Sequence, residues 1–98
     1  MEKFTDIIQS DKPVLVDFFA TWCMPCQAMT PILDELKKRM GDETRILKLD
    51  VDKNQGLAQE YDIRTVPTFM IFKEGKSLWR HSGVLQVNEL EAKLKEFA

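Results

Sequence analysis

The sequence predicts an α/β domain in which a central mixed sheet of four strands is covered by helices on both faces. Segments with helical spacing of apolar residues alternate with short apolar runs typical of strands, in the order α-β-α-β-α-β-β-α. The first two strands and the helix between them suit a right-handed β-α-β unit. With 98 residues and 44% hydrophobic content, the chain suits one hydrophobic core. Residues 1–98 are therefore expected to form a single domain.

The first half of the chain predicts a short helix, a buried strand and a long helix. Apolar residues between positions 4 and 8 have helical spacing, and the segment 11–13, which ends in a proline, separates them from the dense apolar run 14–19. Helical spacing then extends over residues 23–40. Pro31 should kink this helix, because proline has no N–H to donate and crowds the preceding turn.

The second half predicts a strand over residues 46–51 and a short helix through residues 57–61. Two antiparallel strands, 68–72 and 77–82, should flank a hairpin loop at residues 73–76. Asn88 is expected to cap the final helix, whose apolar residues face inward.

Charge and hydropathy exclude several function classes. Fourteen basic and sixteen acidic residues give a net charge of −2 without a block of either sign, which argues against a nucleic-acid partner or a polybasic membrane anchor. No apolar run approaches the roughly 20 residues that span a bilayer, and the N-terminus does not have the pattern of a secretory signal. We expect a monomer in the reducing cytoplasm, although an exported protein whose signal was removed would look the same.

The only two cysteines, Cys23 and Cys26, follow the first predicted strand and are three positions apart. A helix that begins near Cys23 would stabilise a thiolate there through its unpaired N–H groups. Half of a zinc site has the same spacing, but a structural zinc site takes four ligands, and the chain offers one histidine, His81, and no second cysteine pair. A purely structural disulfide would close too short a loop to stabilise the fold much. The pair is interpreted as a redox centre without a metal.

Several separated motifs resemble the thioredoxin family over nearly the whole chain. The pentapeptide Trp-Cys-Met-Pro-Cys at residues 22–26 is similar to the family's active-site turn, Pro31 to its helix-kinking proline, and Thr-Val-Pro-Thr at residues 65–68 to its cis-proline loop. Gly75 and Gly83 also stand where the family has glycines. The resemblance implies the thioredoxin fold without the extra N-terminal strand of longer members, and a reaction with no bound cofactor beyond the redox-active disulfide.

The resemblance also assigns catalytic roles. Cys23 would be the attacking thiolate and Cys26 the resolving thiol, and the two would form a disulfide in the oxidised state. Asp17 interrupts an apolar strand, where a buried carboxylate is costly. The matching aspartate of the family lies beneath the resolving cysteine, so Asp17 is expected to accept a proton from Cys26, with Lys48 modulating it. The alternative is an exposed Asp17 and a solvated Lys48.

A shallow apolar surface around Cys23 is expected to recognise substrate proteins. Its expected members are Trp22, Met24, Pro25, Val66, Pro67, Gly83 and Val84. A cis Val66-Pro67 bond, which the resemblance implies, would offer backbone groups to an extended peptide. Trp22 could instead lie in the core, since tryptophan is highly buried on average. Trp79 and Tyr61 are expected to be packing residues, and His81 a partly exposed strand residue.

Two residues depart from the family pattern, with Met24 in place of the usual glycine and Phe19 in place of a frequent tryptophan. Met24 bears on the reduction potential, because the residues between the cysteines influence the relative stability of thiolate and disulfide. The expected function is a protein-disulfide reductase that keeps protein thiols reduced and is recharged by a thioredoxin reductase. A disulfide oxidase or isomerase, and a noncatalytic subunit that clamps a partner enzyme, are the alternatives.

Overall fold

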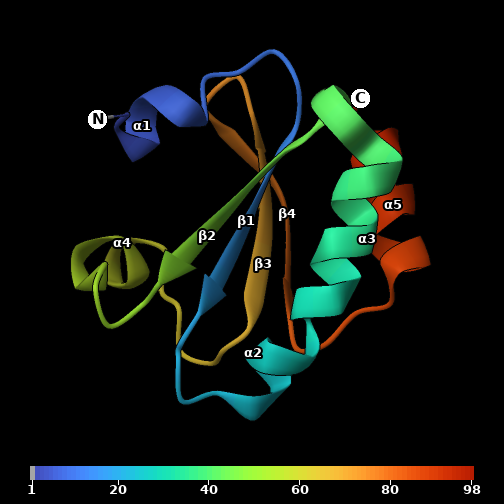
Figure 1. Cartoon of the computed structure of the whole chain (residues 1–98). Helices are drawn as coiled ribbons and strands as arrows, with labels where there is room; N and C mark the ends of the chain where they lie inside the picture. Colours follow the sequence, from blue (N-terminus) through green and yellow to red (C-terminus); the bar gives the residue numbers. More distant parts are fainter. Residues whose placement is uncertain (1) are drawn as a thin grey trace.

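A computed structural model describes residues 2–98, and its elements follow the predicted order except that the long helix is divided in two (Figure 1). The elements are α1 (Phe4–Ile7), β1 (Val14–Phe19), α2 (Met24–Ala28), α3 (Thr30–Met40), a 3₁₀ turn (Gly41–Glu43), β2 (Arg45–Asp50), α4 (Gln55–Glu60), β3 (Thr68–Lys73), β4 (Lys76–Ser82) and α5 (Val87–Glu96).

The four strands form one mixed sheet in the order β2-β1-β3-β4. β1 pairs in parallel with β2 and antiparallel with β3, and β3 pairs antiparallel with β4. The carboxyl ends of β1, β2 and β4 therefore meet the amino end of β3 at one end of the sheet, where α2 lies (Figure 1). Loops that are far apart in sequence come together there.

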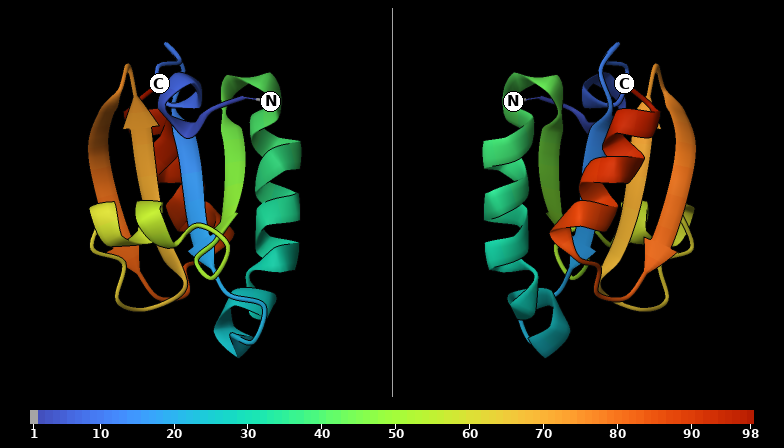
Figure 2. Two further views of the ribbon diagram at one scale, coloured as in Figure 1. Left: turned by 90° about the vertical axis from the view of Figure 1, so that its left-hand side faces the viewer. Right: turned by 90° about the vertical axis from the view of Figure 1, so that its right-hand side faces the viewer.

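Helices cover both faces of the sheet, which confirms the predicted fold class. Alternate side chains of a strand point to opposite faces. Leu15, Phe69 and Ile71 pack in one buried cluster with residues of α3 and α5, whereas Val16 and Phe18 pack in a second cluster with residues of α1 and α4. In the left view of Figure 2, α4 lies in front of the sheet and α5 behind it.

The helix predicted over residues 23–40 is interrupted at Met29, as the position of Pro31 requires. Pro31 has no N–H to bond the carbonyl of Gln27, so the regular helical bond is missing at this point. The Met29 N–H donates to the Cys26 carbonyl over 3.1 Å, and the Leu33 N–H donates to the Met29 carbonyl over 2.8 Å. The turn that carries the cysteines is thus a separate short helix.

The predicted cap of the final helix was wrong. The N-cap residue is Gln86, and Asn88 lies inside the first turn. The Glu89 carboxylate accepts a hydrogen bond from the Gln86 backbone N–H over 3.2 Å, as in a capping box. The Asn88 side-chain oxygen instead accepts a hydrogen bond from the Arg39 guanidinium over 2.7 Å. Asn88 therefore helps to join α5 to α3.

The hairpin between β3 and β4 turns at Glu74 and Gly75, inside the predicted loop. Both residues have positive φ, 53° and 79°, as a two-residue turn of the primed type requires. A Cβ at Gly75 would lie 2.7 Å from the Gln9 amide nitrogen, so a substitution would have to displace this exposed, flexible side chain. Glycine is therefore favoured at position 75 chiefly by the backbone conformation.

Candidate active site

Cys23 and Cys26 form a disulfide at the start of α2. Cys23 is the N-cap residue of this helix, as the sequence predicted, and its sulfur accepts a hydrogen bond from the Cys26 backbone N–H over 3.1 Å. The same donor would stabilise a negative charge on Cys23 after reduction, because a hydrogen bond to the charged form favours that form. The geometry therefore suits Cys23 as the thiolate.

Asp17 lies in the middle of β1 with only 1% of its surface exposed, and its Oδ1 atom has no hydrogen-bond partner among residues 2–98. Burial raises the pKa of this carboxyl from 3.8 to about 6, against a smaller opposite effect of the Lys48 charge. By strand alternation Asp17 faces the same side as Leu15, the side that α3 covers, and is two residues nearer to the cysteines. The alternative of an exposed Asp17 was wrong.

Lys48 lies beside Asp17 in the register of β2 and β1, but its side chain is exposed. Its ammonium group lies 5.1 Å from the centre of the Phe19 ring, within the range of a cation–π contact. The lysine lowers the pKa of Asp17 through its charge. The ion pairs found within residues 2–98 do not join these two residues. Lys48 therefore acts on Asp17 at a distance.

The loop before β3 reaches the cysteines from a distant part of the sequence. The Val66-Pro67 peptide bond is cis, and the Val66 carbonyl oxygen lies 3.6 Å from the sulfur of Cys23. The loop after β4 joins it, because the Gly83 N–H donates to the Pro67 carbonyl over 2.9 Å. Gly83 has φ of 107°, a conformation that favours glycine. The structure thus brings three separate segments to one place.

The apolar side chains around the disulfide are exposed to different degrees. Trp22 is 69% exposed and Met24 is 71% exposed, so the alternative of a core position for Trp22 was wrong. Pro25 and Val84 are also exposed, Val66 is half-buried, and Pro67 is buried. Trp22 and Met24 therefore offer most of their surface to a partner.

Two residues near the site were missed in the sequence. Asp52, in the turn after β2, accepts a hydrogen bond from the indole N–H of Trp22 over 3.0 Å, which orients the exposed ring. Arg80, on β4, donates to the Tyr61 carbonyl and, over 2.7 Å, to the Asp62 carbonyl, and so holds the start of the loop that leads to Val66. Neither contact has a local sequence signal, because each joins segments far apart in the chain.

The remaining candidate residues lie as the sequence predicted. Tyr61 packs in an aromatic cluster with Phe4 and Phe72, and Trp79 is half-buried against the core. His81 is a half-buried residue of β4.

Within residues 2–98 no three histidine, cysteine or acidic side chains are placed to hold a metal ion. None of the helices in the same residues is long and apolar enough to cross a membrane.

Comparison with known proteins agrees with this geometry. The sequence model of the thioredoxin family matches residues 1–96. The chain is 48% identical over 88 residues to thioredoxin Y, chloroplastic, of Oryza sativa subsp. japonica, covering 89% of this chain and 52% of that protein. It is 44% identical over 85 residues to a thioredoxin of Rickettsia felis, covering 87% of this chain and 81% of that protein. The chain thus spans about half the length of the chloroplastic relative.

A solved structure has the same fold. Mitochondrial thioredoxin 3 of Saccharomyces cerevisiae, in its oxidised form, superimposes with a TM-score of 0.85 and 32% identity, covering 95% of this chain and 86% of that one. With its cysteine pair at the start of α2 and a family match over residues 1–96, the chain belongs to the thioredoxin family.

Proposed function

We propose that this chain is a protein-disulfide reductase that works by thiol–disulfide exchange through Cys23 and Cys26. The observation that carries the proposal is the sulfur of Cys23, which accepts the Cys26 N–H and lies 3.6 Å from the Val66 carbonyl, among exposed apolar residues. A substrate disulfide that docks on this surface would meet the thiolate and the Val66 backbone carbonyl together.

The proposed cycle has two exchange steps. The Cys23 thiolate attacks one sulfur of the substrate disulfide, which forms a mixed disulfide and releases the other substrate sulfur as a thiolate. The Cys26 thiolate then attacks the sulfur of Cys23, which releases the second substrate thiol and forms the Cys23–Cys26 disulfide. Two electrons pass from the protein to the substrate. The disulfide in the structure corresponds to the end of this cycle.

Asp17 is proposed as the proton acceptor for Cys26. A carboxyl with a pKa of about 6 is mostly ionised at neutral pH and can take up the thiol proton as Cys26 becomes a nucleophile. Its buried Oδ1 atom, which has no hydrogen-bond partner in the described part of the chain, supports a role in proton transfer. Lys48 would modulate this step through its charge, because it lowers the pKa of the carboxyl.

Substrates, electron donor and compartment belong to the same proposal. We assign disulfide-containing proteins as substrates and a thioredoxin reductase as the donor, on the basis of family membership. Two cysteines in a redox spacing suit a reducing cytoplasm. The chloroplastic and mitochondrial names of similar proteins make an organelle the alternative, which imaging of the tagged chain in its source cells would test.

A trapping experiment tests the assignment of the two cysteines. Cys26→Ser should accumulate mixed disulfides with protein substrates through Cys23, since attack remains possible and resolution does not. Mass spectrometry of the adducts identifies the linked cysteine, with Cys23→Ser as the matched control. Equal adduct formation by both variants would refute the assignment.

The direction of electron flow is tested by the reduction potential of the cysteine pair. Equilibration with glutathione buffers should give a value near those of reductases such as thioredoxin, about −270 mV, and well below the roughly −120 mV of a strong oxidant. A measured potential close to that of the strong oxidant would contradict the reductase assignment and favour a disulfide oxidase.

A second experiment separates catalysis from partner clamping. The wild type should reduce insulin disulfides, and the double variant Cys23→Ser, Cys26→Ser should lose this activity.

A further inference from the structure

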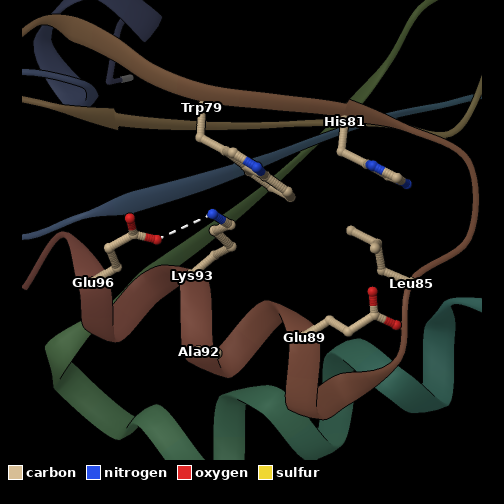
Figure 3. Close-up of a pocket in the computed structure, with 7 residues that line it drawn as sticks. All are labelled: Trp79, His81, Leu85, Glu89, Ala92, Lys93 and Glu96. Carbon is tan, nitrogen blue, oxygen red and sulfur yellow. Dashed lines mark hydrogen bonds and ion pairs between the residues drawn. The ribbon is translucent and has the colours of Figure 1, made fainter.

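A groove of about 430 Å³ lies between β4 and α5, and the cysteines are not among the residues that line it (Figure 3). Trp79 and His81 point from β4 toward α5, and Leu85 closes the side near His81. The two rings are almost parallel, with an interplanar angle of 7° and centroids 6.0 Å apart. Both side chains are only half-buried. Each side chain therefore leaves part of its surface open to a ligand in the groove.

The rim of the groove on α5 is acidic. It carries Glu89, Lys93 and Glu96, and the Lys93 ammonium is already paired with the Glu96 carboxylate over 3.1 Å. The ion pairs of residues 2–98 do not include Glu89, whose Oε1 accepts only the Gln86 backbone N–H. Figure 3 shows Glu89 at the His81 end of the groove and the Lys93–Glu96 pair at the Trp79 end. Among residues 2–98, one carboxylate is thus left without a paired cation beside two half-buried aromatic rings.

The groove is continuous with the surface around the cysteines. Gly83, whose N–H bonds the Pro67 carbonyl, has the Nε2 atom of His81 as its neighbour, 3.9 Å from where a Cβ would stand. Val84, on the proposed docking surface, directly precedes Leu85 of the groove. A polypeptide that lies along Pro67 and Gly83 can therefore extend into the groove.

We propose that this groove is a specificity subsite for an arginine side chain of the disulfide-containing substrate, which rests on the function proposed above. The guanidinium group would stack on Trp79 and His81 and form an ion pair with Glu89. A planar cation suits this site, because guanidinium stacks on aromatic faces and pairs with a carboxylate through two parallel N–H bonds. An anionic ligand is disfavoured, because two carboxylates and one neutralised ammonium surround the space.

A titration without any disulfide tests binding directly. Two cysteine-free peptides are compared that differ only in arginine or its neutral analogue citrulline. The chain has two tryptophans, so the indole N–H resonances of Trp79 and Trp22 can be followed separately by NMR, with Trp22→Phe for their assignment. The arginine peptide should shift the Trp79 resonance more than the citrulline peptide does, and Glu89→Gln should remove the difference. Equal shifts with both peptides in the wild type would overturn the proposal.

Glu89→Gln is a suitable variant because glutamine keeps an oxygen that can accept the Gln86 N–H, so the start of α5 is preserved while the charge is lost. Glu60→Gln, an exposed position on α4, gives the same change of charge outside the groove and should keep the response of the wild type.

The kinetic test uses the same pair of peptides with a disulfide added. The kcat/KM for the arginine peptide should exceed that for the citrulline peptide about three- to tenfold, as expected of an ion pair and a cation–π contact at a partly exposed site. The ratio should fall to about one in Glu89→Gln and stay unchanged in Glu60→Gln. An unchanged ratio in Glu89→Gln would refute the subsite. Failure to reduce either peptide would refute the proposed function, and the NMR titration would still decide the subsite.

Discussion

At the scale of single residues, Asp17 is a carboxyl group buried where water cannot solvate its charge. Desolvation raises its pKa to about 6, and the Lys48 charge offsets only part of this effect. An acid with a raised pKa binds its proton more tightly in the folded state than in the unfolded state. Stability therefore falls as pH rises from about 4 to about 6, and the full cost remains at neutral pH. The fold retains a residue that destabilises it.

Asp17→Asn should stabilise the oxidised protein at pH 8 by up to about 3 kcal/mol and much less at pH 4, because the buried charge is removed. Urea unfolding at both pH values measures the difference. Asp34→Asn, an exposed position on α3, is the control and should change stability little at either pH. The same Asp17 variant should slow resolution by Cys26 more than attack by Cys23. A stability gain of equal size at both pH values would show that the charge is not its cause.

Trp22 gives a second prediction at this scale. Asp52→Ala removes the acceptor that orients the exposed indole ring, so KM for protein substrates should rise about two- to tenfold, while kcat changes less. Asp52→Asn retains an oxygen acceptor and should behave like the wild type. Steady-state reduction of insulin measures both constants. If Asp52→Asn were as impaired as Asp52→Ala, the charge of Asp52 and not its hydrogen bond would be responsible.

At the scale of elements, the positions of the helix ends determine where Cys23 and Glu89 lie. The break at Met29 leaves α2 as a short helix whose N-cap is Cys23, and α3 continues as the main support against the sheet. The start of α5 is fixed by Gln86 and Glu89, and Arg39 of α3 reaches Asn88 and Glu91 of α5. Gln86 and Glu89 thus form the cap that was predicted at Asn88, and Asn88 instead contacts Arg39 of the neighbouring helix.

Glu89→Ala should therefore destabilise the protein by about 1 kcal/mol, because the Gln86 N–H loses its acceptor. Asn88→Ala should cost less, since it removes one exposed hydrogen bond from an Arg39 that keeps two carboxylate partners. Thermal or urea unfolding compares the two variants. A larger loss for Asn88→Ala would mean that the contact of Asn88 with Arg39 contributes more stability than the hydrogen bond between Glu89 and Gln86.

At the scale of the whole molecule, the sheet separates two apolar cores and gathers the site at one end. Leu15 faces α3 and α5 with none of its surface exposed, whereas Val16, the next residue, faces α1 and α4. The cysteines follow β1, the Val66 loop precedes β3, and Gly83 follows β4. The strand order, rather than any one motif, brings these segments together.

Leu15→Ala should cost about 2–5 kcal/mol, because it leaves a cavity beneath both α3 and α5. Leu78→Ala, the matched change at a position on β4 that is 37% exposed, should cost far less. Thermal unfolding of the oxidised protein would give the comparison. Similar losses in the two variants would mean that β4 is covered in solution, for example by a second copy of the chain.

The sequence by itself determined the fold class, a helix irregularity caused by Pro31, the hairpin turn and the two cysteines; the complete division of the helix at Met29 was not predicted. Each of these depends on short-range signals, namely the period of apolar residues, the missing N–H of proline and the spacing of the thiols. The burial of Asp17 was also predictable, since a lone charge in an otherwise apolar strand has few other environments.

Only the tertiary structure decided which face of the active-site turn meets solvent and what surrounds it. The exposed Trp22 ring is oriented by Asp52, 30 residues away, and Cys23 meets Val66 from 43 residues away. The groove beside Trp79 likewise exists only because α5 packs beside β4. These contacts join segments whose approach depends on strand order and helix packing, and no local pattern of residues encodes that approach.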